Sequence, residues 1–152
     1  DAVRVMADGR FKATQIKTLP YPGFPTDLQS PLMAVFATIP GESCIQESVF
    51  EDRFKIAEEL NRMGAEIKIQ GKKAWIRGSF CLKGTKVRAQ ELRGGAALVI
   101  AALVANDFST VCDIKYIQRG YEKFDEKLRG LGALIEKVET DKEIQKFKLK
   151  VG

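Results

Sequence analysis

Two hydrophobic patterns alternate along the chain, and each predicts a different kind of element. Apolar residues recur at helical spacing over 50–63 and again over 121–131, and a glycine follows or ends each stretch, as is typical of a helix C-terminus. Over 67–77 and 147–151, apolar and polar residues instead alternate with a period of two. That pattern predicts strands that bury one face. We therefore expect two helices, a hairpin that turns at Gly71-Lys72, and a C-terminal strand.

Two further helical segments, 32–39 and 98–104, are apolar on nearly every side. A helix of that kind must be surrounded by protein. Because the predicted strands bury only one face, the helices are expected at the centre and the sheets outside. This is the reverse of most α/β domains, in which the sheet is central.

The sequence also resembles itself when it is shifted by 68 positions. The shift aligns Cys44 with Cys112 and Met63-Gly64-Ala65 with Leu131-Gly132-Ala133. Because the matched glycines close the same kind of helical pattern, we interpret the two halves as copies of one supersecondary unit.

We expect a single domain fragment made of three parts. Residues 1–24 would be the end of a preceding unit, and residues 25–88 and 89–152 would be the two copies. Within the first part, a hairpin over 1–17 with its turn at Asp8-Gly9 is expected.

Composition narrows the class of protein. The chain has 152 residues, of which 45% are hydrophobic and 30% charged, as in an ordinary globular domain. Its longest apolar run, over 96–105, is too short to cross a bilayer. We also expect no signal peptide. Three cysteines, an odd number, argue against a closed disulfide framework. We expect a cytoplasmic protein with no membrane partner.

The charged residues bear on the chemistry. A net charge of +5 favours anionic partners, either phosphate-bearing metabolites or nucleic acid. The chain has no histidine, so it lacks the commonest zinc ligand and the commonest general base. We expect no metal and no cofactor, and acid–base chemistry run by Asp, Glu, Lys, Tyr or Cys.

Several predicted helix starts carry residues that suit an anion. Thr26 and Gln29 have the spacing of a capping box, with Asp27 at the first helical position. Arginines at helix starts oppose the helix dipole, so an anionic ligand nearby would explain them. These arginines are Arg53, Arg93, which precedes Gly94-Gly95, and Arg119.

Structural explanations stay open for each of these residues. Asp27 could merely complement the dipole, and Gly94-Gly95 could merely allow close helix packing. Cys44 and Cys112 are expected in the core. The alternating lysines of 146–150 are expected on the solvated side of a strand. A nucleic-acid platform would need interleaved exposed aromatics, so a nucleic-acid partner is not expected.

Four motifs stand out when they are taken together. They are Pro22-Gly23-Phe24-Pro25-Thr26-Asp27-Leu28-Gln29, Glu47-Ser48-Val49-Phe50-Glu51-Asp52-Arg53-Phe54, Leu92-Arg93-Gly94-Gly95-Ala96 and Arg119-Gly120-Tyr121-Glu122. As a set, they resemble the UDP-N-acetylglucosamine enolpyruvyl transferases. The resemblance implies an inside-out α/β barrel of repeated βαβαββ units, of which this chain would be the C-terminal part. Members of the family transfer the enolpyruvyl group of phosphoenolpyruvate to the 3-hydroxyl of UDP-N-acetylglucosamine, the first committed step of peptidoglycan synthesis.

The resemblance also implies roles for single residues. Asp27 matches the carboxylate that contacts the sugar hydroxyl and acts as the base, and Val49 with Phe50 matches a wall of the nucleotide-sugar site. Three arginines match those that hold the phosphate and carboxylate of the substrate: Arg53, Arg93 and Arg119.

The match has departures and alternatives. The family usually has Asn at Asp52, Asp at Glu91 and Gln118, and His at Tyr116. The resemblance places the proton-donating Cys loop in an N-terminal domain absent from this chain, so the isolated chain is expected to be inactive. Two alternatives are a shikimate-pathway enolpyruvyl transferase and a non-catalytic module that binds an anion, a nucleotide or RNA.

Overall fold

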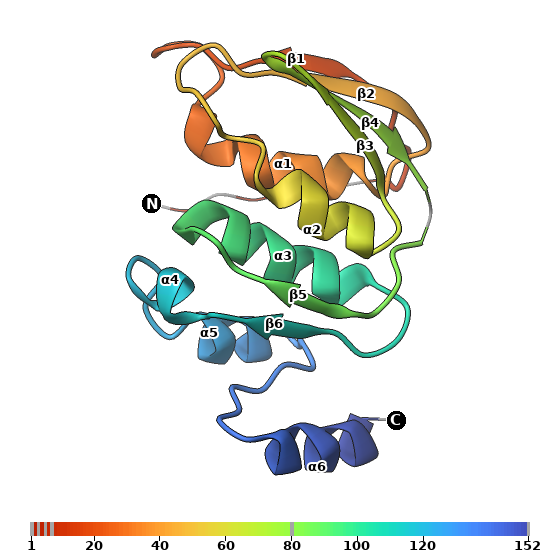
Figure 1. The fold of residues 1–152 in the computed structure, drawn as a ribbon, viewed down its shortest axis with the longest axis vertical. Coiled ribbons are helices and arrows are strands. Elements are labelled where there is room, and N and C mark those ends of the chain that lie inside the picture. The colour runs from red at the N-terminus through yellow and green to blue at the C-terminus, as the bar shows by residue number, and fades with distance from the viewer. Residues whose placement is uncertain (1, 3, 5, 7, 80, 152) are drawn as a thin grey trace.

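The computed structural model describes residues 2, 4, 6, 8–79 and 81–151 and contains two sheets (Figure 1). The first is four-stranded, in the order β1-β2-β4-β3. Strands β1 and β2 are parallel, and the other neighbours are antiparallel. The second is a parallel pair, β5 with β6. The strands are β1 (Gln15–Lys17), β2 (Gly41–Gln46), β3 (Glu66–Gln70), β4 (Lys73–Gly78), β5 (Lys86–Arg88) and β6 (Thr110–Cys112).

The hairpin expected over 67–77 is confirmed. Strands β3 and β4 pair with Ile67 opposite Ile76 and Gln70 opposite Lys73. Gly71 takes a φ of 57°, a left-handed conformation that glycine adopts at little cost. The alternating pattern therefore set both the strands and their register.

Three helices lie between the two sheets (Figure 1). They are α1 (Gln29–Phe36), which follows a short 3-10 helix η1 (Thr26–Leu28), α2 (Ile56–Arg62) and α3 (Leu92–Val104). Met33 of α1, Leu60 of α2 and Leu98 of α3 share one core with Ile45 and Ile76 of the large sheet. The prediction of central helices and outer sheets is therefore confirmed.

The central helices are not buried along their whole length, however. Val35 in α1 is 40% exposed, and Leu103 and Val104 at the end of α3 are 39% and 55% exposed. The expectation that 98–104 is surrounded on every side is therefore wrong at its last turn.

The self-similarity of the sequence has a counterpart in the elements. Helix α5 (Phe124–Gly130) begins and ends 68 residues after α2, and strand β6 falls within the range 68 residues after β2. A parallel crossover also occurs twice along the chain, as β1-α1-β2 and as β5-α3-β6. The strand pairs join β1 to β2 and β5 to β6, so β1 and β5 go with the elements that follow them. The predicted unit boundaries, between residues 24 and 25 and between residues 88 and 89, remain predictions.

Both amphipathic helices begin later than expected. Helix α2 starts at Ile56 and α5 at Phe124, rather than at residues 50 and 121. Asp52 and Lys123 have positive φ values of 54° and 48°, and a helix cannot continue through that conformation. A separate short helix, α4 (Lys115–Gln118), lies before α5.

The predicted strand over 147–151 is wrong, because this segment belongs to helix α6 (Asp141–Val151). Thr140 and Glu143 form a capping box: the Glu143 carboxylate accepts the Thr140 N–H at 3.0 Å, and the Thr140 hydroxyl accepts the Glu143 N–H at 3.3 Å. Ile144, Phe147 and Val151 then follow at helical spacing. The period-two reading overlooked this cap.

The hairpin expected over 1–17 is not formed by the described residues. Only Gln15–Lys17 is a strand there, and it pairs in parallel with β2. Residues 3, 5 and 7 of the expected first strand lie outside the described residues.

In the part of the chain that is described, none of the helices is both long and apolar enough to cross a membrane.

Candidate active site

Asp27 and Arg93 come from different copies of the unit and meet at the start of α3. Asp27 lies in η1 and Arg93 in the first turn of α3, and Arg93 Nε is 2.7 Å from Asp27 Oδ1. The Asp27 side chain is 58% exposed, and the Arg93 side chain is 31% exposed. A guanidinium in the first turn of a helix opposes the dipole, and the Asp27 carboxylate compensates it. This pair is the centre of the candidate site.

The capping box expected from Thr26 and Gln29 is not formed. Thr26 belongs to η1, which has no side-chain cap, and its hydroxyl donates instead to Glu47 Oε2 at 2.8 Å. Gln29 is fully buried. The Thr26 hydroxyl therefore has a tertiary partner, which spacing within one helix cannot reveal.

Glu91 caps the N-terminus of α3. Its carboxylate accepts the N–H of Gly94 and, at 3.1 Å, the N–H of Arg93. A Cβ on Gly94 would lie 2.7 Å from Glu91 Oε1, and a Cβ on Gly95 would lie 2.7 Å from Ile117 Cγ1. Gly94 therefore leaves room for the Glu91 cap, and Gly95 allows close packing against Ile117. The sequence left open whether these glycines serve packing or the approach of a ligand to the backbone, and the structure favours packing.

Val49 and Phe50, the predicted wall, lie two and three residues after Glu47. Their backbone N–H groups both donate to Glu47 Oε1, at 2.8 and 3.1 Å. The Phe50 side chain is 51% exposed, and the guanidinium carbon of Arg53 lies 4.6 Å from the centre of its ring. Arg53 is therefore held against the wall by a cation–π contact, three residues before α2 begins.

Arg119 does not open a helix, contrary to the expectation from sequence. It is the C-cap residue, immediately after α4, where its positive charge suits the dipole. Its guanidinium carbon lies 5.4 Å from the centre of the Tyr116 ring. A Cβ on the next residue, Gly120, would lie 2.8 Å from the Leu92 side chain. The Arg119 segment thus packs directly against the start of α3.

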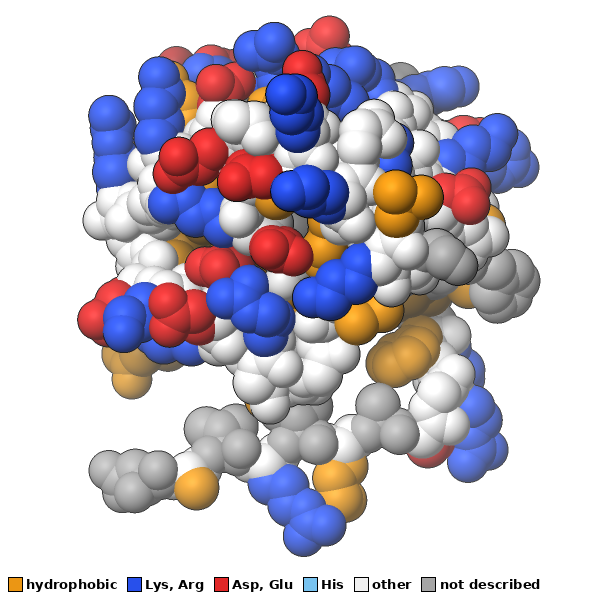
Figure 2. Space-filling model, turned by 90° about the horizontal axis from the view of Figure 1, so that it is seen from below, with side chains coloured by type: hydrophobic (Ala, Val, Ile, Leu, Met, Phe, Trp, Pro, Cys, Tyr) orange, Lys and Arg blue, Asp and Glu red, His pale blue; other side chains and the backbone are white. Residues whose placement is uncertain are grey.

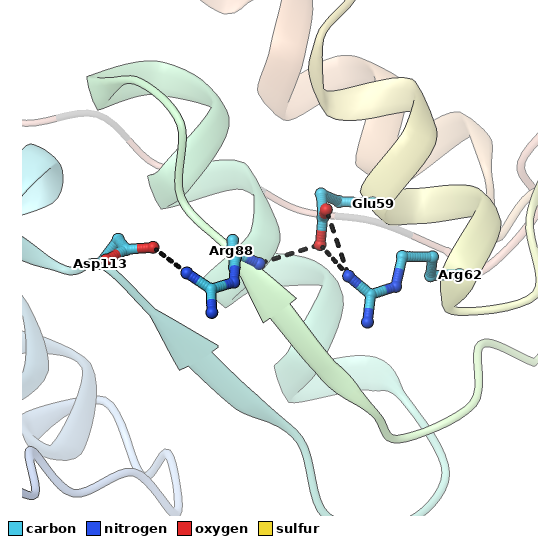
Figure 3. A network of polar contacts seen from close by, with 4 residues as sticks. All are labelled: Glu59, Arg62, Arg88 and Asp113. Carbon is cyan, nitrogen blue, oxygen red and sulfur yellow. Dashed lines mark hydrogen bonds and ion pairs between the residues drawn. The ribbon is translucent and has the colours of Figure 1, made fainter.

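A buried carboxylate that the sequence analysis missed anchors the chain leading to α3. Glu59 of α2 is 5% exposed and accepts the backbone N–H of Arg88 at 2.9 Å (Figure 3). Arg62 contacts the same carboxylate at 3.4 Å, and the Arg88 guanidinium reaches Asp113 at 3.2 Å. The sequence does offer one indication of this role: Glu59 is an acidic residue on the apolar face of a predicted helix, one turn after Ile56.

Glu59 also borders a small hollow beside the site. Lys55 from the segment before α2, Arg88 at the end of β5, and Glu91 with Gly94 at the start of α3 line the same hollow. The segments that carry Arg53, Arg93 and Arg119 therefore all border the first turn of α3. Their catalytic roles remain predictions.

Two of the cysteines lie in strands of the two sheets. Cys44 in β2 is buried, and Cys112 in β6 is half-buried. Burial raises the pKa of the Cys44 thiol above its ordinary value, although the nearby Lys73 acts in the opposite direction. Cys44 thus occupies the core as predicted, and Cys112 does so in part. Among the described residues, His, Cys, Asp and Glu side chains form no cluster suited to a metal ion.

Comparison with known proteins identifies the family. Residues 1–128 match the family described as EPSP synthase (3-phosphoshikimate 1-carboxyvinyltransferase). The chain is 57% identical over 138 residues to UDP-N-acetylglucosamine 1-carboxyvinyltransferase 2 of Carboxydothermus hydrogenoformans, covering 91% of this chain and 33% of that protein. It is 53% identical over 135 residues to UDP-N-acetylglucosamine 1-carboxyvinyltransferase of Desulfofundulus thermocisternus, covering 89% and 56%.

Solved structures agree in fold. The enolpyruvyl transferase NikO from Streptomyces tendae matches with a TM-score of 0.74 and 30% identity, over 80% of this chain and 28% of NikO. EPSP synthase from Acinetobacter baumannii matches with a TM-score of 0.54 and 20% identity, over 76% and 26%. This chain therefore spans between about a quarter and about half of the proteins it resembles. It has the fold of the enolpyruvyl transferases and belongs to the EPSP synthase (3-phosphoshikimate 1-carboxyvinyltransferase) family.

Proposed function

We propose that this chain forms the C-terminal part of a UDP-N-acetylglucosamine 1-carboxyvinyltransferase and supplies one side of its active site. The observation that carries the proposal is the contact of Asp27 with Arg93, which joins a carboxylate and a guanidinium from two motifs of the family resemblance. Such an enzyme would act in the cytoplasm on peptidoglycan precursors, and so in cell-wall formation, cell shape and division.

The proposed chemistry uses Asp27 as a general base. Asp27 takes the proton of the sugar 3-hydroxyl as that oxygen bonds to C2 of phosphoenolpyruvate, while C3 gains a proton. Loss of phosphate from C2 and of a proton from C3 then restores the double bond. Because Asp27 is 58% exposed, a bound substrate can reach it without rearrangement of the core.

The arginines are proposed to hold the anionic groups of phosphoenolpyruvate. A guanidinium matches a carboxylate or phosphate with two parallel hydrogen bonds. Arg93 borders the base directly, Arg53 is held over Phe50, and Arg119 precedes Gly120, which packs against Leu92. Charge that develops in the tetrahedral intermediate would be stabilised by these groups. The Val49–Phe50 wall is proposed to contact the nucleotide sugar.

The remainder of the site is proposed to come from an N-terminal domain. Without the proton-donating loop and the closed, water-excluded cleft, the 152 residues should bind the nucleotide sugar weakly and turn nothing over. No metal and no cofactor take part in the proposed reaction.

A shikimate-pathway enzyme is the second candidate, since the family description and the Acinetobacter structure name 3-phosphoshikimate or EPSP synthase. Identities of 53–57% to relatives named for UDP-N-acetylglucosamine, against 20% to that structure, favour the nucleotide sugar.

A nucleic-acid partner is not proposed. On the face shown in Figure 2, acidic side chains are interspersed among the lysines and arginines, which weakens attraction for a phosphate backbone.

The test uses a hybrid enzyme. In the Carboxydothermus hydrogenoformans relative, the matched segment is replaced by that of this chain. Phosphate release is then measured with phosphoenolpyruvate and either UDP-N-acetylglucosamine or shikimate 3-phosphate. We expect turnover with the nucleotide sugar only. An inactive hybrid that folds, or one that prefers shikimate 3-phosphate, would contradict the proposal, as would tighter binding of single-stranded RNA than of the nucleotide sugar to the isolated chain.

A further inference from the structure

Glu47 is a buried carboxylate that accepts hydrogen bonds on both of its oxygens. It follows β2 and is 2% exposed. Its Oε1 accepts the Thr18 hydroxyl at 2.7 Å and the N–H groups of Val49 and Phe50 at 2.8 and 3.1 Å. Its Oε2 accepts the Thr26 hydroxyl at 2.8 Å. A buried charge is costly unless such bonds compensate it, so this arrangement fixes the carboxylate in one orientation.

The two oxygens of Glu47 hold different parts of the candidate site. Oε2 holds Thr26, the residue immediately before the proposed base Asp27. Oε1 holds the backbone of Val49 and Phe50, the proposed sugar wall. Asp27 has no hydrogen bond of its own to that wall among the described contacts. The planar carboxylate is therefore the direct side-chain link between the turn that carries the base and the wall.

We propose that Glu47 is a positioning residue: it sets the spacing between Asp27 and the Val49–Phe50 wall, so that the sugar hydroxyl bound against the wall meets the base in a reactive geometry. The inference rests on the proposed function. Hydrogen bonds to an ionised acceptor are shorter and stronger than neutral ones. They therefore suit a residue that must keep two segments at a fixed distance. A misplacement of about 1 Å at a reacting centre can cost about a hundredfold in rate.

A purely structural role makes a different prediction. If the carboxylate only satisfied buried groups, loss of one of its bonds would lower stability, and the molecules that remain folded would keep their KM and kcat. A positioning role requires that both constants change in fully folded enzyme. The bond between Glu47 and Thr26 separates the two cases, because it connects to the base and not to the wall.

The test is Thr26→Val in the hybrid enzyme, which removes the hydroxyl with little change in volume. Thr26→Ser restores a hydroxyl, and Thr38→Val is the matched control, since the Thr38 hydroxyl donates to the Val35 carbonyl at 2.8 Å at the end of α1. We expect kcat/KM for UDP-N-acetylglucosamine to fall about tenfold or more in Thr26→Val, with a higher KM and a lower kcat. Thr26→Ser should recover most of the loss, and Thr38→Val should show none. Equal losses in the two valine variants, or no recovery with serine, would overturn the proposal.

A second measurement does not depend on activity. In the 152-residue chain, Glu47→Gln should speed amide hydrogen exchange at both Val49 and Phe50, because a neutral amide oxygen accepts these bonds more weakly. The amide of Ile67, which donates to Asn61 Oδ1 at 2.8 Å, is the internal control. Unchanged exchange at Val49 and Phe50 would show that Glu47 does not hold the wall. If exchange changes as expected but the unmutated hybrid is inactive, the proposed function fails while the link stands.

Discussion

Arg93 reaches from the first turn of α3 to Asp27 in η1, with 2.7 Å between Nε and Oδ1, and so joins residues that are 66 positions apart. The contact lies at the surface, where an ion pair contributes little to folding. At the same time it compensates an arginine that the helix dipole disfavours. Because the pair adds little to stability, the proposed role of Asp27 in catalysis can be measured separately from its effect on folding.

Asp27→Asn is therefore expected to affect activity far more than stability. In the hybrid enzyme, loss of the base should lower kcat by about 10²–10⁴. The free energy of unfolding should change by less than about 1 kcal/mol, because the pair is solvent-exposed. Phosphate release and urea denaturation measure the two quantities. The control is Asp125→Asn, which breaks the Asp125–Arg129 pair of 3.0 Å in α5 and should leave kcat unchanged. An equal loss of kcat in both variants would refute the role of Asp27.

The carboxylate of Glu47 should make the fold sensitive to acid. Burial raises its pKa, but the hydrogen bonds from Thr18, from the backbone of Phe50 and Val49, and from Thr26 lower it more, and the result is a pKa below the ordinary 4.5. A carboxyl with a lowered pKa in the folded state adds stability above its unfolded pKa, and this stability is lost as pH falls through the folded value.

Urea denaturation of the 152-residue chain between pH 7 and pH 3 tests this expectation. The free energy of unfolding of the unmutated chain should drop as pH falls below about 4.5. Glu47→Gln should be less stable at pH 7 and show a shallower drop, since its side chain does not titrate. Parallel curves for the two proteins would contradict the assignment.

Two glycines offer a matched test of packing at the start of α3. A Cβ on Gly95 would lie 2.7 Å from Ile117 Cγ1 and 2.9 Å from the Ala89 Cβ, whereas a Cβ on Gly130 would meet nothing within 4 Å. Gly95→Ala should therefore destabilise the chain by about 1–3 kcal/mol. Gly130→Ala should stabilise it by about 0.4–1 kcal/mol, because alanine loses less backbone freedom on folding. Urea midpoints measure both, and a Gly95→Ala chain as stable as the original would contradict the packing explanation for Gly95.

Local patterns predicted the elements whose partners lie within this chain. The alternation of Ile67 and Ile69 marked β3 because β4 follows at once to pair with it. The apolar stretch over 98–104 marked α3 because its buried face packs in the same core as α1. From these two features alone, central helices with outer sheets could be inferred.

Features that depend on contacts distant in sequence escaped the same reasoning. The Thr26 hydroxyl was assigned to a capping box but bonds to Glu47, which is 21 residues away. Arg119 was placed at a helix start because nothing in the sequence reveals that Lys123 adopts a left-handed conformation. Glu47 accepts the distant Thr26 hydroxyl and Glu59 the distant Arg88 N–H, and neither contact follows a fixed spacing in the sequence.

Helix α6 should be nearly dispensable for the stability of this chain. None of its described residues is buried. The helix contacts the Phe108 ring through Phe147, with ring centres 5.9 Å apart, and through Lys148, whose Nζ lies 4.9 Å from the ring centre. An isolated helix of this length is marginal in water, and an aromatic pair adds about 0.5–1.5 kcal/mol. Removal of residues 140–152 should therefore lower the free energy of unfolding by about 1 kcal/mol, and Phe147→Ala should reproduce most of that loss. The chain's single tryptophan, Trp75 in β4, reports unfolding of the core by fluorescence in both proteins. A truncated chain that fails to fold, or one that loses several times more stability than Phe147→Ala, would show that α6 supports the core through more than this contact.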